Sequence, residues 1–117
     1  MKKQKYVFRE LIDEIKEIYL ADGNEAFYKG DGWCVYAKTE KLSLKSECYV
    51  LPYPDVDDDD NEIYPEFAVQ NGLLFIYRDE MLQDVIANAV DEDEEISDKK
   101  LLKAINYYDK YDSFMEF

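Results

Sequence analysis

The segment VFRELIDEIKEIYL, residues 7–20, carries the pattern that most constrains the fold. Its apolar residues recur every three or four positions with charged residues between them, which is the spacing of one face of an α-helix. Gly23 follows shortly after and is suited to end a helix. The sequence therefore predicts an amphipathic helix that packs on a core. Its apolar face comprises Phe8, Leu11, Ile12, Ile15, Ile18 and Tyr19.

Three short apolar runs have the composition of β-strands. WCVYA (residues 33–37) follows the turn-forming stretch KGDGW, and ECYVLPY (residues 47–53) reaches its end near Pro52 and Pro54. LLFIY (residues 73–77) is the densest apolar run and suits a buried strand. We expect the first two runs to pair as an antiparallel hairpin.

Further helices are predicted between and after these strands. The stretch YPEFAVQNG indicates a short helix with Pro65 in its first turn and Gly72 at its end. Asp79 is a candidate cap for the next helix, and Ser97 is a candidate cap for the last one. A length of 117 residues is typical of one domain. The prediction is a single α+β domain, residues 1–117, with about three strands packed with about four helices.

The residue inventory argues against catalysis and against a cofactor. The chain has no histidine, and its four glycines lack the spacing of a phosphate-binding loop. Its two cysteines, Cys34 and Cys48, are expected to be buried, reduced thiols. No apolar run approaches the length of a membrane span, and the basic start MKKQK lacks the apolar stretch of a signal peptide. We therefore expect a cytoplasmic protein that is not an enzyme and holds no cofactor or metal.

The charge of the chain is concentrated in two acidic runs, residues 55–66 and 91–98. They hold thirteen of the 28 acidic residues and no lysine or arginine, while the formal net charge of the chain is -14. Such a charge repels nucleic acid and anionic membranes but attracts a basic protein. We expect both runs to contribute to a protein-binding surface, and the sequence leaves open whether they meet in space. Solvated loops that aid solubility are the plainer alternative.

The first run also has a resemblance in spacing to a calcium-binding loop. Counted from Asp55, carboxylates stand at positions one, three, five and twelve, the last being Glu66, as in an EF-hand. Asp60 stands where the loop requires glycine, Pro65 precedes the final ligand, and the preceding segment is strand-like. A calcium-binding module at residues 55–66 is therefore kept as an alternative function.

Tyrosines accompany the acids and strengthen the interpretation of a binding surface. Tyr53 and Tyr64 flank the aspartates, and tyrosine is enriched at protein interfaces. A further aromatic stripe of Tyr107, Tyr111 and Phe114 on the last helix is expected to extend the core contact. The candidate partner-binding residues are Tyr53, Asp55, Asp57, Asp58, Asp59, Asp60, Glu62, Tyr64, Asp91, Glu92, Asp93, Glu94 and Glu95.

The second half of the chain resembles small acidic bacterial immunity proteins of contact-dependent growth inhibition and other polymorphic toxin systems. The resemblance rests on PEFAVQNGLLFIYRDEMLQDVIANAV and LLKAINYYDKYDSF, about half of the chain. It implies a cytoplasmic inhibitor that binds a cognate basic toxin domain, in many cases a nuclease, and covers its active or substrate-binding surface. It assigns no individual contact residue. A nucleic-acid-mimicking inhibitor of a host DNA-binding protein is a third alternative with the same charge argument.

Overall fold

The structure, a computed structural model, describes residues 4–23, 25 and 32–116. It is a single α+β domain, as predicted, with more strands than the sequence indicated. The helices of the described residues are α1 (Phe8–Asp22), α2 (Glu66–Gln70), α3 (Asp79–Glu92) and α4 (Asp98–Tyr111). The strands are β1 (Lys5–Val7), β2 (Cys34–Ala37), β3 (Glu47–Leu51), β4 (Asp55–Val56), β5 (Glu62–Ile63) and β6 (Leu74–Arg78).

Four of the strands form the main sheet, in the order β1-β3-β2-β6. All three pairings are antiparallel, and the predicted hairpin of β2 and β3 is confirmed with Val35 opposite Val50. Strand β1 was missed because it has only three residues and runs directly into α1. At that length it has too few residues for an alternating pattern to stand out in the sequence.

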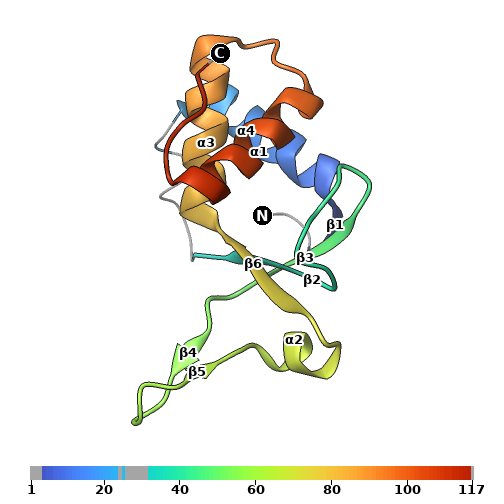
Figure 1. Ribbon diagram of the computed structural model, residues 1–117, viewed down its shortest axis with the longest axis vertical. Helices are drawn as coiled ribbons and strands as arrows, with labels where there is room; N and C mark the ends of the chain where they lie inside the picture. Colours follow the sequence, from blue (N-terminus) through green and yellow to red (C-terminus); the bar gives the residue numbers. More distant parts are fainter. Residues whose placement is uncertain (1–3, 24, 26–31, 117) are drawn as a thin grey trace.

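Three helices cover one face of the sheet, and a single short helix covers part of the other (Figure 1). The main core joins α1, α3 and α4 to the sheet and contains Phe8, Ile86 and Ile105, all fully buried. Strand β2 alternates between the two faces and is buried along its whole length, as a central strand should be. On the second face, Tyr36 packs in a small cluster with Ala68 of α2.

Several predicted helix ends agree with the structure. Gly23 follows α1 with a positive φ of 67°, where glycine carries no steric penalty. The Ser97 side chain accepts a hydrogen bond from the backbone N–H of Lys100 and caps α4. The prediction for α3 was wrong: Arg78 is the residue before the helix, and Asp79 is its first residue. The Asp79 carboxylate serves a different purpose, described below.

Both cysteines are free and fully buried in the described structure, in agreement with the sequence prediction. Burial raises the pKa of both thiols to about 12. No helix among the described residues is long and apolar enough to cross a bilayer.

Candidate functional site

The first acidic run projects from the body of the protein as a hairpin (Figure 1). The sequence predicted a loop here, and the structure instead pairs β4 with β5, with Asp55 opposite Ile63 and Val56 opposite Glu62. The molecule measures 43 × 28 × 27 Å, and the hairpin lies at one end of the long axis. We call residues 53–64 the arm.

Hydrogen bonds to one aspartate build the tip of the arm. The Asp57 carboxylate accepts the backbone N–H groups of Asp59 and Asn61, both at 2.9 Å. The backbone N–H of Asp60 donates to the Asp57 carbonyl at 3.1 Å, and Asp60 has a φ of 63°. Aspartate tolerates this left-handed conformation better than most residues do. The N–H groups of Asn61 and Asp59 hold the pKa of the Asp57 carboxyl below its ordinary value.

This geometry does not support the calcium-binding alternative. One Asp57 carboxylate oxygen is occupied by backbone donors, and Glu66, the expected final ligand, lies in α2 with its carboxylate accepting the Gln70 side chain at 2.9 Å. Within residues 4–23, 25 and 32–116, no three acidic or cysteine side chains are grouped so as to hold a metal ion. The carboxylates that are spaced as in an EF-hand therefore belong to a hairpin and the start of a helix, and they do not form a calcium-binding loop.

Hydrogen bonds to one buried carboxylate anchor the arm to the body. Asp79 is only 7% exposed, and its carboxylate accepts the backbone N–H of Trp33 at 3.2 Å and that of Glu80 at 2.7 Å. The Tyr53 hydroxyl also donates to this carboxylate. The Tyr53 ring lies against Gly32, where an added Cβ would meet it at 2.6 Å. Tyr53, predicted as a contact residue, is therefore first of all the anchor of the arm, and Asp79 was missed as its partner.

Apolar side chains on the arm remain in contact with solvent. Val56 is 61% exposed, Ile63 is 50% exposed and Tyr64 is 39% exposed, and the Tyr64 hydroxyl donates to Glu62 at 2.6 Å. Because Val56 and Ile63 are not opposite each other in the hairpin, each face of the arm carries one apolar and one acidic side chain. Val56 and Ile63 were not predicted as contact residues, although acids and apolar residues alternate on both sides of the tip.

The second acidic run lies at the opposite end of the molecule, so the two runs do not form one surface. It begins in the last turn of α3 and ends at the first residue of α4, at the top of Figure 1, while the arm is at the bottom. Parts of the run are used within the fold: Asp91 accepts the Tyr19 hydroxyl at 2.7 Å, and Asp93 accepts the backbone N–H of Glu95 at 3.0 Å. Glu92, Glu94 and the other acids of residues 91–95 are exposed.

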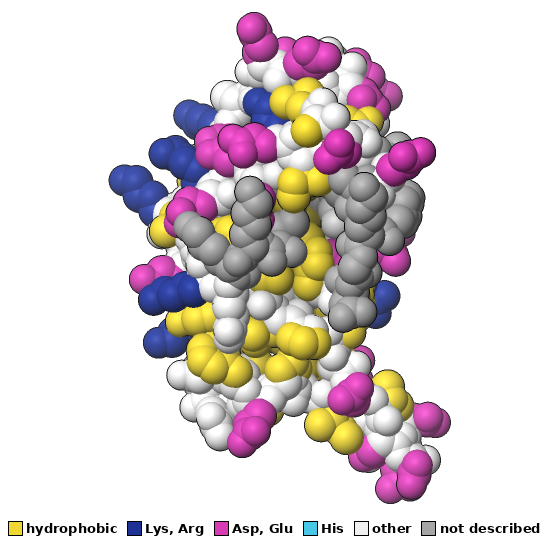
Figure 2. All heavy atoms as spheres, turned by 180° about the vertical axis from the view of Figure 1, so that it is seen from behind, with side chains coloured by type: hydrophobic (Ala, Val, Ile, Leu, Met, Phe, Trp, Pro, Cys, Tyr) yellow, Lys and Arg dark blue, Asp and Glu magenta, His cyan; other side chains and the backbone are white. Residues whose placement is uncertain are grey.

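Basic side chains contact the second acidic run, where the Lys16 ammonium donates to the Ile96 carbonyl at 2.9 Å, but the arm carries none. Figure 2 shows lysines and arginines along one side of the body, with acidic side chains at the top and on the arm. Arg9 pairs with Asp98 of the second acidic run at 3.5 Å. Asp98 also faces Asp13; burial and this neighbour raise the pKa of the Asp13 carboxyl to about 6. The arm itself contains no lysine or arginine, so its charge is not neutralised locally.

The predicted aromatic stripe is more exposed than expected, and Phe114 lies beyond the end of α4 at Tyr111. Tyr107 is 37% exposed, Tyr111 is 55% exposed and Phe114 is 44% exposed. Tyr107 and Tyr111 contact each other with ring centroids 4.6 Å apart. The expectation that the stripe extends the core was therefore wrong, because the inward face of α4 is filled by Leu101, Ala104 and Ile105.

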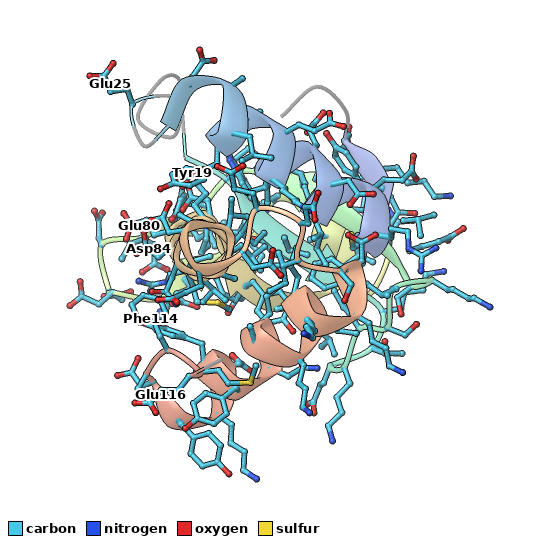
Figure 3. The ribbon with its side chains drawn as sticks, turned by 90° about the horizontal axis from the view of Figure 1, so that it is seen from above. Tyr19, Glu25, Glu80, Asp84, Phe114 and Glu116 are labelled. Atoms are coloured by element: carbon cyan, nitrogen blue, oxygen red, sulfur yellow. The ribbon has the colours of Figure 1, made fainter. Side chains whose placement is uncertain are left out.

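A surface pocket lies between α3 and the C-terminal part of α4. It has a volume of about 370 Å³, and its lining includes Glu80, Asp84, Tyr108 and Asp109. Glu80 and Asp84 project from the same side of α3 (Figure 3). Burial, followed by the Glu80 charge, raises the pKa of Asp84. The pocket offers carboxylates without a metal-binding arrangement in the described residues, so the arm is the stronger candidate site.

Comparison with known proteins identifies a family for the chain. The family model described as "Domain of unknown function (DUF7716)" matches residues 14–117, which includes the arm, α2 and all of α3 and α4. No curated protein matches the chain, and no solved structure matches it.

Proposed function

The chain belongs to the DUF7716 family, and we propose that it is an immunity protein that binds a cognate basic toxin domain, a nuclease. It neutralises the toxin by covering its active or substrate-binding surface. The arm makes the contact. The observation that carries this proposal is the projecting hairpin, on which exposed apolar side chains stand beside unneutralised acids.

The acids of the arm provide attraction over a distance. Asp58, Asp59 and Asp60 are exposed at the tip, and the arm has no basic residue to offset them. A nuclease holds nucleic acid with lysines and arginines that contact phosphates. Carboxylates at the tip attract those same side chains, which speeds association and makes it dependent on salt.

The apolar side chains of the arm provide contact area at short range. Isolated apolar residues on a surface need no explanation, but Val56, Ile63 and Tyr64 all lie on one small projection, with Val56 and Ile63 on its two opposite faces, so a partner that encloses the arm contacts both. Interfaces commonly place such residues at their centre, with charged residues at the rim. Asp55 and Glu62, next to Val56 and Ile63 on the paired strands, would belong to that rim.

The proposal centres on residues 53–64 and narrows the surface expected from the sequence. Asp91, Glu92, Asp93, Glu94 and Glu95 lie at the other end of a molecule that is 43 Å long. These five residues would contact the same partner as the arm only if that partner spanned the whole length of the molecule. Their exposed carboxylates instead contribute to the overall negative field, which acts on a basic partner at low salt.

The test is to express the neighbouring reading frame of the source genome with and without this protein, and to score growth. We expect the neighbour to be toxic alone and the chain to relieve that toxicity. Toxicity that this chain does not relieve would refute the proposal. A pull-down from the source bacterium distinguishes the nucleic-acid-mimic alternative, since a host DNA-binding protein would then be captured in place of the neighbour.

Binding kinetics of the purified pair locate the contact. The Asp58→Asn, Asp59→Asn variant removes two exposed charges and retains Asp57, whose carboxylate builds the tip. We expect slower association and a weaker salt dependence. Glu92→Gln, Glu94→Gln is the matched control, because it removes the same charge at the far end. Equal effects of the two variants would exclude the arm as the contact surface.

A further inference from the structure

A second surface pocket lies where three elements meet. The start of α1, the connection between β2 and β3, and the start of α4 come together there, on the right of Figure 1. The pocket has a volume of about 540 Å³, which is within the range of ligand-binding sites in proteins. It shares no lining residue with the arm or with the pocket between α3 and α4.

Contacts within the chain fix the walls of this pocket. The Arg9 N–H donates to the Leu44 carbonyl at 3.1 Å, which joins α1 to the connection between β2 and β3. Within that connection, the Ser46 N–H donates to the Ser43 carbonyl at 3.1 Å and closes a turn. The Arg9 guanidinium then reaches Asp98 at the start of α4 at 3.5 Å. A ligand therefore meets walls whose backbone is already ordered, which lowers the cost of binding.

The charge of this pocket is opposite to that of the molecule. Arg9, Lys45 and Lys99 line it against the single carboxylate of Asp98, in a chain with a formal net charge of -14. We call it the basic pocket. Within the described part of the chain, no carboxylate forms an ion pair with Lys45 or Lys99. Farther along α1, Asp13 faces Asp98, and the charge of Lys16 opposes that of Asp13. The lining therefore keeps an excess of two positive charges.

The lining has the groups that hold a phosphate monoester. Guanidinium and ammonium groups bind phosphate oxygens, and an excess of two positive charges matches the charge of about -2 on a phosphate monoester. The Ser97 hydroxyl accepts the Lys100 N–H, so its own hydrogen is available to donate to a phosphate oxygen. Leu44 and Leu102 are half-buried and offer apolar surface to an organic group.

We propose that the basic pocket binds a small organic phosphate monoester. Arg9, Lys45 and Lys99 hold the phosphate, and the organic group lies against Leu44 and Leu102. A ligand of the size of the pocket meets mainly this local charge, whereas a long nucleic acid would also meet the negative field of the whole molecule. The inference does not depend on the proposed function, because the basic pocket is on the body and the toxin contact is on the arm.

The experiment is a titration of the isotope-labelled full chain with phenyl phosphate at constant ionic strength, followed by amide chemical shifts and by calorimetry. We expect one saturable site, with shifts confined to Arg9 and to residues 43–46 and 97–102. Lys45→Gln, Lys99→Gln should weaken binding at least tenfold, because it removes two charged donors to the phosphate. Lys41→Gln, Lys110→Gln is the matched control, since it removes the same charge from exposed lysines that line a different pocket.

Two further probes test the class of ligand. Inorganic phosphate lacks the organic group, and benzoate carries a single negative charge, so both should bind at least tenfold more weakly than phenyl phosphate. The four lysines are exposed, and circular dichroism melts verify that both double variants are folded. Absence of a saturable site at millimolar phenyl phosphate overturns the proposal, as does equal weakening by the two double variants. Benzoate binding as tight as that of phenyl phosphate overturns the assignment to a phosphate monoester.

Discussion

Replacing Tyr53 with phenylalanine tests whether the arm is held by the buried carboxylate of Asp79. The substitution removes the hydroxyl that donates to Asp79 and keeps the ring that packs against Gly32. A hydrogen bond to a charged group contributes about 1.5–3 kcal/mol to stability. Because Asp79 retains the N–H groups of Trp33 and Glu80, we expect the lower part of that range, about 1.5–2 kcal/mol.

The expected change in melting temperature follows from the size of the domain. An unfolding entropy of about 2.1 cal/mol/K per residue over 117 residues gives roughly 0.25 kcal/mol per degree. A loss of about 1.5–2 kcal/mol therefore lowers the melting temperature by about 6–8 °C. Urea titration should show a lower midpoint with an unchanged slope, because the surface exposed on unfolding is nearly the same.

Tyr64→Phe is the matched control for Tyr53→Phe. Its hydroxyl also donates to a carboxylate, that of Glu62 at 2.6 Å, and the two tyrosines are similarly exposed, but Glu62 is exposed whereas Asp79 is buried. Exposed interactions of this kind contribute about 0–1 kcal/mol. Equal destabilisation by the two substitutions, or a Tyr53→Phe protein as stable as the wild type, would refute the assignment of Asp79 as the anchor.

The pH dependence provides an independent check on the same bond. Burial, together with the hydrogen bond to Asp79, raises the pKa of Tyr53 above its ordinary value of 10.0. The folded state therefore favours the protonated hydroxyl of Tyr53. The stability that this preference contributes is complete below pH 10 and is lost as the pH rises above it. The stability difference between wild type and Tyr53→Phe should shrink above pH 10. A stability difference that stayed constant with pH would contradict the hydrogen bond from Tyr53 to Asp79.

Three further predictions concern other parts of the molecule. Cys34 and Cys48 should not react with a thiol reagent at neutral pH in the native state and should both react in urea, because burial raises their pKa values to about 12; rapid native labelling would contradict this. Asp13 has a folded pKa of about 6 against an ordinary 3.8, so its contribution to stability is lost as the pH rises from about 4 past 6. Asp13→Asn should remove this pH dependence of the unfolding free energy, measured by urea titration. If the unfolding free energy of the variant changed with pH as it does in the wild type, Asp13 and its neighbour Asp98 would be excluded as the cause. Asp60→Gly should raise the melting temperature by relieving a positive φ, whereas Asp60→Val should lower it; the reverse order would contradict the turn geometry.

Local patterns predicted most of the main elements correctly. The helical spacing from Phe8 onward, the cap at Ser97 and the β2–β3 hairpin all agree with the structure. These features depend on residues close in sequence, so periodicity and capping chemistry suffice to find them. The loop expected at residues 55–66 is a hairpin in the structure. Asp79 was predicted wrongly as a helix cap, because its carboxylate is held by Trp33 and Tyr53, which are distant in sequence.

The sequence alone determined that this chain is a strongly acidic α+β domain whose charge gathers in two runs, because composition and local periodicity are properties of the chain itself. Only the tertiary structure decided where those runs lie. They occupy opposite ends of the molecule since α3 carries the second run away from the sheet, while the arm extends from the other side. The exposure of Val56 and Ile63 was likewise decided by which surfaces the helices cover.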